Sequence, residues 1–190
     1  MMKGMGNRLR AGAEGHPIDL ADFENPLDFL VEEHFRERSL CSVIDAVADT
    51  DAPEPVAMTQ VLAFLDAELP THIQDELTHV FPLLRLRCLA EDEIGPVIDA
   101  VVAEHDATTA SVQALAGMLK RQLEDGSVWS EAERVRLHHF AAHVRRHVVL
   151  ENAILLPIAR ARLSKVDLAS LRRSMLEGRQ TCAVGGDNAG

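Results

Sequence analysis

The sequence predicts an all-α protein, a four-helix bundle with a short additional C-terminal helix. Four long stretches place apolar residues three and four positions apart, the spacing of a helix that buries one face. Turn-forming residues separate these stretches. The chain of 190 residues has 47% hydrophobic content, which is enough for one domain with a substantial core.

Capping and turn residues mark where the helices begin and end. Asn25 suits the N-cap of the first helix and Pro26 its first position. Gly126 belongs to a turn that ends the third helix, and Ser130 with Glu133 has the spacing of a capping box at the start of the fourth. We therefore expect four long helices and a shorter amphipathic one, over residues 26–49, 55–89, 95–124, 130–162 and 166–177.

The two ends of the chain differ in composition from the rest. The start is rich in glycine, and the end is rich in glycine, asparagine and alanine. Such segments bury too little apolar surface to fold stably. We therefore expect a disordered N-terminal segment at 1–20, the bundle at 21–178 and a disordered tail at 179–190.

Composition and charge limit the kinds of partner. The formal net charge is −11, with the basic residues scattered among more numerous acids, which argues against nucleic-acid binding. No apolar run is long enough to span a membrane, and the start lacks the apolar core of a secretion signal. The three cysteines are far apart and form no CxxC pair. We expect a cytoplasmic protein without nucleic-acid or membrane partners; the sequence does not identify a protein partner.

The apolar line of each long helix, called the seam below, also contains polar residues. In helix two the expected seam is Met58, Leu62, Leu65, Leu69, His72, Glu76, His79 and Leu83, and in helix four it is Leu137, Phe140, Val144, His147, Glu151, Ile154 and Ile158. His105 lies on the seam of helix three, and the expected seam of helix one is Leu27, Leu30, His34, Cys41, Ile44 and Ala48. Burying two glutamates without compensation would be severely unfavourable. A metal centre would resolve this conflict.

These polar residues form an internal repeat. A histidine precedes a glutamate by four residues twice, and each pair follows a lone histidine on the preceding helix; the six residues are His34, His72, Glu76, His105, His147 and Glu151. Side chains four apart on a helix face the same way, about 6 Å from one another, so each pair can direct two ligands to one point. Four imidazoles and two carboxylates suit a pair of metal ions with the glutamates as bridges.

Ligand type narrows the choice of metal. Structural zinc prefers thiolates, and the chain has no cysteine cluster. Imidazoles combined with carboxylates suit iron or manganese. Ligand type alone therefore leaves iron and manganese open for a binuclear centre bridged by the two glutamates.

The remaining histidines have competing interpretations. His143 lies one turn before His147 and is either an additional ligand or a proton relay. His79 lies one turn beyond Glu76 and is either a second layer of contact around the metal or simply buried; we favour the latter. His138 and His139 are expected at the surface, and Glu104 is expected in solvent.

Prolines follow both repeated pairs. Pro82 and Pro157 each lie six residues after the glutamate. Because proline lacks the amide hydrogen and clashes with the preceding turn, each either opens the helix beside the site or simply kinks it. Pro70 is expected to bend helix two as well.

The order of the six residues resembles the hemerythrin-like, or HHE cation-binding, proteins over about residues 26–160. The Val80-Phe81-Pro82 and Leu155-Leu156-Pro157 endings add to the resemblance. It implies an up-down-up-down bundle around a non-haem, carboxylate-bridged centre of two iron ions, with manganese and zinc ranked behind iron. The four histidines would be terminal ligands and the two glutamates bridges. Members of the family bind or react with dioxygen, peroxide or nitric oxide.

Two departures separate this chain from the oxygen-carrying hemerythrins. Those proteins have a second histidine four residues after the first on the third helix and an aspartate on the fourth, where this chain has Thr109 and Glu151. The resemblance is therefore to the four-His, two-Glu branch, which implies a role in oxidative or nitrosative stress response or sensing. Two alternatives remain open: a catalase-like enzyme that dismutates peroxide, and an iron donor for repair of iron–sulfur clusters. Repair proteins typically carry an additional cysteine-containing N-terminal domain, which residues 1–25 do not supply.

Overall fold

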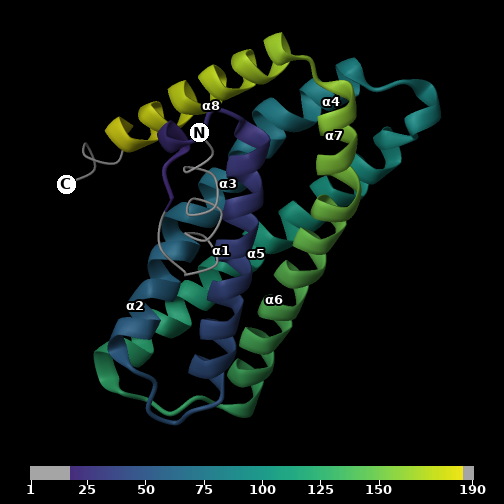
Figure 1. The fold of residues 1–190 in the computed structure, drawn as a ribbon. Coiled ribbons are helices and arrows are strands. Elements are labelled where there is room, and N and C mark those ends of the chain that lie inside the picture. Colours follow the sequence, from purple (N-terminus) through teal and green to yellow (C-terminus); the bar gives the residue numbers. More distant parts are fainter. Residues whose placement is uncertain (1–17, 186–190) are drawn as a thin grey trace, which may run out of the picture.

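Four antiparallel helical rods form the bundle, and a fifth helix crosses one end of it (Figure 1). The computed structural model describes residues 18–185, with side chains for 18–180. Short 3-10 helices, η1 (Leu20–Asp22) and η4 (Ala90–Asp92), precede the first and third rods. The rods are α1 (Pro26–Ala48); α2 (Pro55–Ala63), α3 (Leu69–Asp75) and α4 (Phe81–Arg87), which run on as one; α5 (Ile94–Asp125); and α6 (Glu131–Leu150) continued by α7 (Leu156–Arg162).

Local sequence explains where the rods start and stop. The Asn25 side chain accepts a hydrogen bond from the Leu27 amide at the start of α1. Ser130 and Glu133 form the expected capping box at the start of α6. Gly126 ends α5 with a φ of 66°, a left-handed conformation that glycine adopts without strain. The all-α bundle with an extra helix is therefore confirmed, with rod ends within two residues of the expected ones.

Helix α8 (Lys165–Gly185) is longer than expected and lies across the end of the bundle. Residues 179–185, which the sequence assigned to a disordered tail, continue this helix. Arg179 explains part of the difference, because its guanidinium bonds Glu33 at 2.7 Å and Asp75 at 2.6 Å and lies over the Phe29 ring. Residues 1–17 and 186–190, the greater part of the two expected disordered segments, lie outside the described residues.

Three π turns interrupt the second and fourth rods: η2 (Phe64–Glu68), η3 (Glu76–Val80) and η5 (Glu151–Leu155). Each ends two residues before a proline: Pro70, Pro82 and Pro157. A proline ring clashes with the carbonyl four residues earlier, and the wider π turn relieves that clash. Of the two interpretations left open by the sequence, local opening of the helix is the correct one.

Each π turn adds one residue to the helical repeat and so shifts the seam that follows it. After Glu76, Val80 and Leu84 are buried where His79 and Leu83 were expected. After Glu151, Leu155 and Ala159 take the places expected for Ile154 and Ile158. The expected seams are wrong beyond the two glutamates for this reason.

The buried apolar residues form two clusters, one at each end of the bundle. One lies toward the α1–α2 and α5–α6 turns and includes Leu40, Leu65 and Phe140. The other lies toward α8 and includes Leu27, Phe81 and Met175. A polar layer separates them, as described below. No described helix is both long and apolar enough to cross a lipid bilayer.

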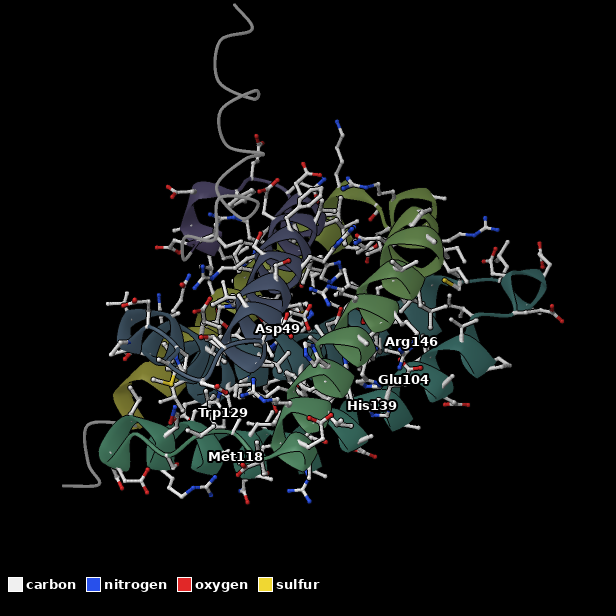
Figure 2. The ribbon with its side chains drawn as sticks, turned by 90° about the horizontal axis from the view of Figure 1, so that it is seen from below. Asp49, Glu104, Met118, Trp129, His139 and Arg146 are labelled. Carbon is white, nitrogen blue, oxygen red and sulfur yellow. The ribbon has the colours of Figure 1, made fainter. Side chains whose placement is uncertain are left out.

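The connecting turns close the far end of the bundle, seen from below in Figure 2. Trp129 is buried there and donates from its indole nitrogen to the Val47 carbonyl at 2.9 Å. His138 on α6 bonds Asp45 at 2.8 Å and Asp49 at 3.0 Å, which ties α6 to the end of α1. His139 is exposed, as expected.

Candidate metal centre

The six residues of the repeat meet in the middle of the bundle, between the two apolar clusters. They come from all four rods and are buried, with exposed fractions between 0% and 6%. They form two groups whose nitrogen and oxygen atoms lie within 4.8 Å of one another: His34, His72, Glu76 and Glu151, and Glu76, His105, His147 and Glu151. Both glutamates belong to both groups. The repeat thus places the two carboxylates between two pairs of imidazoles.

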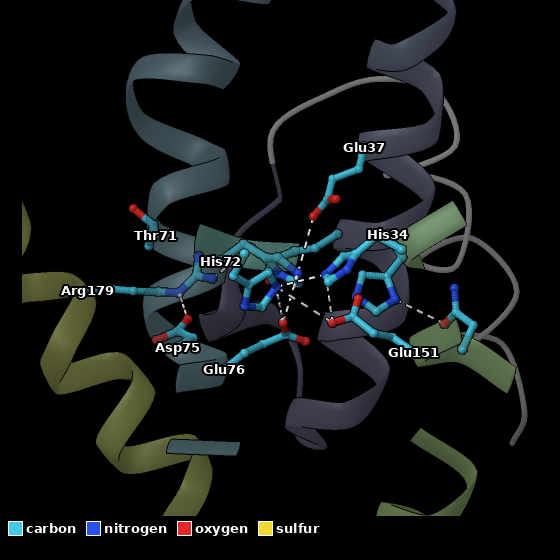
Figure 3. A network of polar contacts seen from close by, with 12 residues as sticks. His34, Glu37, Thr71, His72, Asp75, Glu76, Glu151 and Arg179 are labelled. Atoms are coloured by element: carbon cyan, nitrogen blue, oxygen red, sulfur yellow. Dashed lines mark hydrogen bonds and ion pairs between the residues drawn. The ribbon is translucent and has the colours of Figure 1, made fainter. Parts of the chain in front are cut away.

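Individual distances show how closely the carboxylates approach the rings (Figure 3). Glu151 lies 3.3 Å from His34 Nε2 and 3.1 Å from His147 Nε2. Glu76 lies 3.2 Å from His105 Nε2 and 3.7 Å from His72 Nε2. The four Nε2 atoms therefore all face the two carboxylates.

The local helix geometry sets the position of both glutamates. Glu76 and Glu151 each begin a π turn, and the amides of Phe81 and Leu156 bond their carbonyls five residues back. The α-helical turn before each glutamate keeps it on the same face as the histidine four residues earlier. The π turn then returns the following apolar residues to the core. A π turn that begins at each glutamate thus allows the polar layer to have apolar packing on both sides.

The outward nitrogens of three rings are held by hydrogen bonds. His34 Nδ1 donates to Asn152 at 3.0 Å, His72 Nδ1 to Glu33 at 3.1 Å and His147 Nδ1 to Glu104 at 2.9 Å. With a proton on Nδ1, each ring presents the Nε2 lone pair inward, as metal binding requires. His105 Nδ1 has no hydrogen-bond partner among the described residues, and its ring stacks on Phe81 with centroids 5.8 Å apart.

None of these three contacts was anticipated from the sequence. Glu104 was expected in solvent, but it is half-buried and orients His147. It lies next to His105 in the chain, and its contact to α6 depends on how the two rods pack. Glu33 is held in turn by Arg179 of α8.

Burial and mutual charge perturb the titration of these groups. Burial, followed by the neighbouring His147, lowers the pKa of His105 to about 3, so its ring is neutral. Burial and the adjacent Glu151 raise the pKa of Glu76. Burial alone would raise the pKa of Glu151, but the His147 imidazole at 3.1 Å and the other nearby imidazoles hold this pKa well below its usual range. Without a metal ion, the two carboxylates compete for the same positive charge.

The donor set fits metal ions. Several inward-facing buried atoms have no hydrogen-bond partner among the described residues: His34 Nε2, His72 Nε2, Glu76 Oε2 and both oxygens of Glu151. Buried polar atoms without partners are costly and rare in folded proteins. Imidazole nitrogens and carboxylate oxygens that converge in this way would hold two ions, with the carboxylates shared.

The structure places His143 and His79 outside both groups. His143 is half-buried, and its Nε2 lies 3.0 Å from the Thr108 hydroxyl, with its ring centroid 6.4 Å from that of His147. His79 is half-buried and faces Gly178 of α8, because the π turn η3 rotates it off the seam. The expectation that His79 lies on the seam is therefore wrong.

Sequence reasoning missed a third carboxylate at the centre. Glu37 on α1 is 4% exposed, and its Oε1 lies 3.3 Å from His72 Nε2. It follows His34 by three residues and fills the gap in the expected seam between His34 and Cys41. That gap in the apolar spacing was the sign in the sequence that Glu37 faces the core. Burial raises the pKa of Glu37 to about 7.

A small chamber lies against this layer. It has a volume of about 10 Å³, and the residues around it come from all four rods: Glu37, Leu69, His72, Ile73, His105, Thr108, Val144 and His147. Its wall combines apolar side chains with three of the histidines. A space of this size admits only a very small ligand.

Comparison with known proteins agrees with this geometry. The family model for the hemerythrin HHE cation binding domain matches residues 25–159, most of the chain. Neither the comparison with curated proteins nor that with solved structures gives a match. The matched span contains all six residues of the repeat and the four rods that hold them, except for the last three residues of α7. The chain therefore belongs to the hemerythrin HHE cation-binding family.

Proposed function

We propose that this protein is a non-haem di-iron protein whose centre binds or reacts with dioxygen, peroxide or nitric oxide in an oxidative or nitrosative stress response or in sensing. The observation that carries the proposal is the sharing of Glu76 and Glu151 between two pairs of histidines beside a chamber of about 10 Å³. His34 and His72 would hold one ion, and His105 and His147 the other. A bound iron pair supplies redox chemistry and a free coordination position for a small ligand.

The protein side chains contribute binding, orientation and exclusion of water. Asn152, Glu33 and Glu104 orient three of the rings through Nδ1. The apolar side chains of Leu69, Ile73 and Val144 close the chamber. Because the six candidate ligands are at most 6% exposed, the site favours retained metal over rapid donation to another protein.

A spectroscopic titration tests this proposal. We expect the iron-loaded protein to show new visible absorption bands when nitric oxide or peroxide is added. Glu151→Gln should lose them, because it removes a carboxylate shared by both groups. Glu131→Gln, an exposed glutamate at the start of α6, is the matched control and should keep them. An iron-loaded protein that responds to neither ligand would contradict the proposed reactivity. Metal analysis of the same samples distinguishes iron from manganese.

Consumption of peroxide is the second candidate function, and a specific contact favours it. Thr108 borders the chamber, and its hydroxyl donates to the Glu104 carbonyl at 2.9 Å and accepts from His143 Nε2 at 3.0 Å. His143 also borders a surface cavity of about 450 Å³ between α5 and α6. An imidazole in this position can exchange protons between the chamber and solvent.

Replacing His143 separates this relay from a structural role. We expect His143→Ala to keep its iron content and to consume peroxide roughly 100-fold or more slowly, the lower end of the range for loss of general acid–base catalysis. His139→Ala, one turn earlier and exposed at the same cavity, should match wild type; Figure 2 labels this residue. Equal peroxide consumption by the two variants would show that His143 is no relay.

A further inference from the structure

Glu37 is the one carboxylate at the centre that neither the repeat nor the proposed bridges account for. It enters from α1, three residues after His34, and points toward the imidazole of His72 (Figure 3). Its Oε1 is buried and has no hydrogen-bond partner among the described residues. The atom it approaches, at 3.3 Å, is His72 Nε2, the nitrogen that also faces Glu76.

The two nearby arginines pair with other carboxylates. Arg36, the chain neighbour of Glu37, bonds Glu68. Arg179 bonds Glu33 and Asp75. Buried carboxylate oxygens without hydrogen-bond donors are costly and rare in folded proteins. A metal ion beside His72 would supply the missing charge at the place where Glu37 points.

We propose that Glu37 is a further protein ligand of the metal ion held by His34 and His72. The proposal rests on the metal centre proposed above. Glu37 lies outside the groups whose atoms are all within 4.8 Å of one another, so it reaches the ion by rotation of its side chain. One ion would then have up to five protein ligands and the other four, which makes the centre asymmetric.

The asymmetry would determine which ion takes an external ligand. Glu37 and His72 border both the chamber and an outer cavity of about 190 Å³, whose rim includes the exposed Ala67. Glu37 thus lines the chamber on the His72 side. The ion held by His105 and His147 would have one protein ligand fewer, so it would be the one open to an external ligand, on the side of the chamber that Thr108 lines.

Metal binding to the Glu37→Gln variant tests the proposal without measuring activity. The amide keeps the shape of the side chain but removes its charge. We expect a chelator competition with ferrous iron under anaerobic conditions to show one ion bound as in wild type and the other weakened roughly tenfold or more. The melting temperature of the metal-free variant should equal or exceed that of metal-free wild type, because a buried charge has been removed. The increase in melting temperature on adding iron should be smaller for the variant than for wild type.

Glu68→Gln is the matched control. Glu68 borders the outer cavity and bonds Arg36, but it makes no contact with the six repeat residues in the described contacts. We expect it to bind two ions with wild-type affinity. If Glu68→Gln loses iron affinity as Glu37→Gln does, the loss comes from removing a negative charge near the outer cavity rather than from removing a ligand, and the proposal is wrong.

Failure of this inference is distinguishable from failure of the metal centre. If Glu37→Gln binds both ions as wild type does, Glu37 is not a ligand, while the proposed centre stands. A variant that melts lower by the same amount with and without iron would show a purely structural role and also overturn the inference. If wild type binds no iron, both proposals fall.

Discussion

At the scale of single residues, the centre depends on hydrogen bonds that fix three of its four imidazole rings. Three of the four imidazoles donate a hydrogen bond from their outward nitrogen, Nδ1, to a carboxylate or amide oxygen. Such contacts select the tautomer, raise the basicity of the ligand and hold the ring in place. His105 instead relies on stacking against Phe81. Orientation of the ligands is therefore divided among residues outside the repeat.

Glu104→Ala tests the weight of one such contact. We expect the variant to bind the ion held by His105 and His147 about tenfold more weakly, because His147 loses the hydrogen-bond partner of its Nδ1. Asp106→Ala is the matched control, since Asp106 is an exposed acid two residues further along α5. Iron affinity measured by chelator competition checks both. Equal affinities in the two variants would show that the contact to His147 does not matter for binding.

At the scale of helical elements, the π turns reconcile the polar layer with the core. All three occur before a proline, and η3 and η5 each add one residue between a glutamate of the metal layer and the apolar residues that follow. If the fourth rod were regular, Ile154 rather than Leu155 would face the core. Pro82 and Pro157 therefore do more than bend the rods, because they specify the register on the α8 side of the metal layer.

A deletion checks this explanation of the register. Removing Ala153, an exposed residue inside η5, leaves Leu155 three positions after Glu151 in a regular α-helix. Pro157 would then clash with the preceding turn, and we expect a loss of stability of about 3 kcal/mol or more. Adding Pro157→Ala to the deletion should recover most of that loss. Urea unfolding of the three proteins measures it, and no recovery in the double variant would contradict the explanation.

The elements and most of the site were predictable from local patterns. Capping and turn residues such as Asn25 and Gly126 predicted the helix ends. The position of the six polar residues among apolar seam residues predicted that they are buried together. The π turns were not predicted, although the position of each proline was a usable sign. Arg179 and Glu104 act through contacts with other helices, which spacing along the chain does not reveal. Glu37 was predictable in principle, since it occupies the seam position between His34 and Cys41.

At the scale of the whole molecule, a buried polar layer divides the hydrophobic core. The two apolar clusters pack on either side of it and share Leu77 as a partly buried neighbour. Helix α8 closes one end and reaches the layer through Arg179 and Glu33. Metal binding would satisfy the layer and so contribute directly to the stability of the bundle.

Metal removal should therefore destabilise the fold. Metal at roughly 1,000 times its dissociation constant stabilises a protein by about 4 kcal/mol. For a chain of this size that corresponds to a melting temperature about 10 °C lower after chelation. Trp129 is the single tryptophan and is buried, so its fluorescence reports the transition. If the metal-free and metal-loaded proteins melt at the same temperature, the six residues do not form a shared buried site.

Elemental analysis of the purified protein tests whether two metal ions share Glu76 and Glu151. We expect about two iron ions per chain in wild type. In Glu151→Gln we expect less than one, because both groups lose a common ligand. One zinc ion per chain, or no metal at all in wild type, would show that the two carboxylates do not bridge a pair of iron ions.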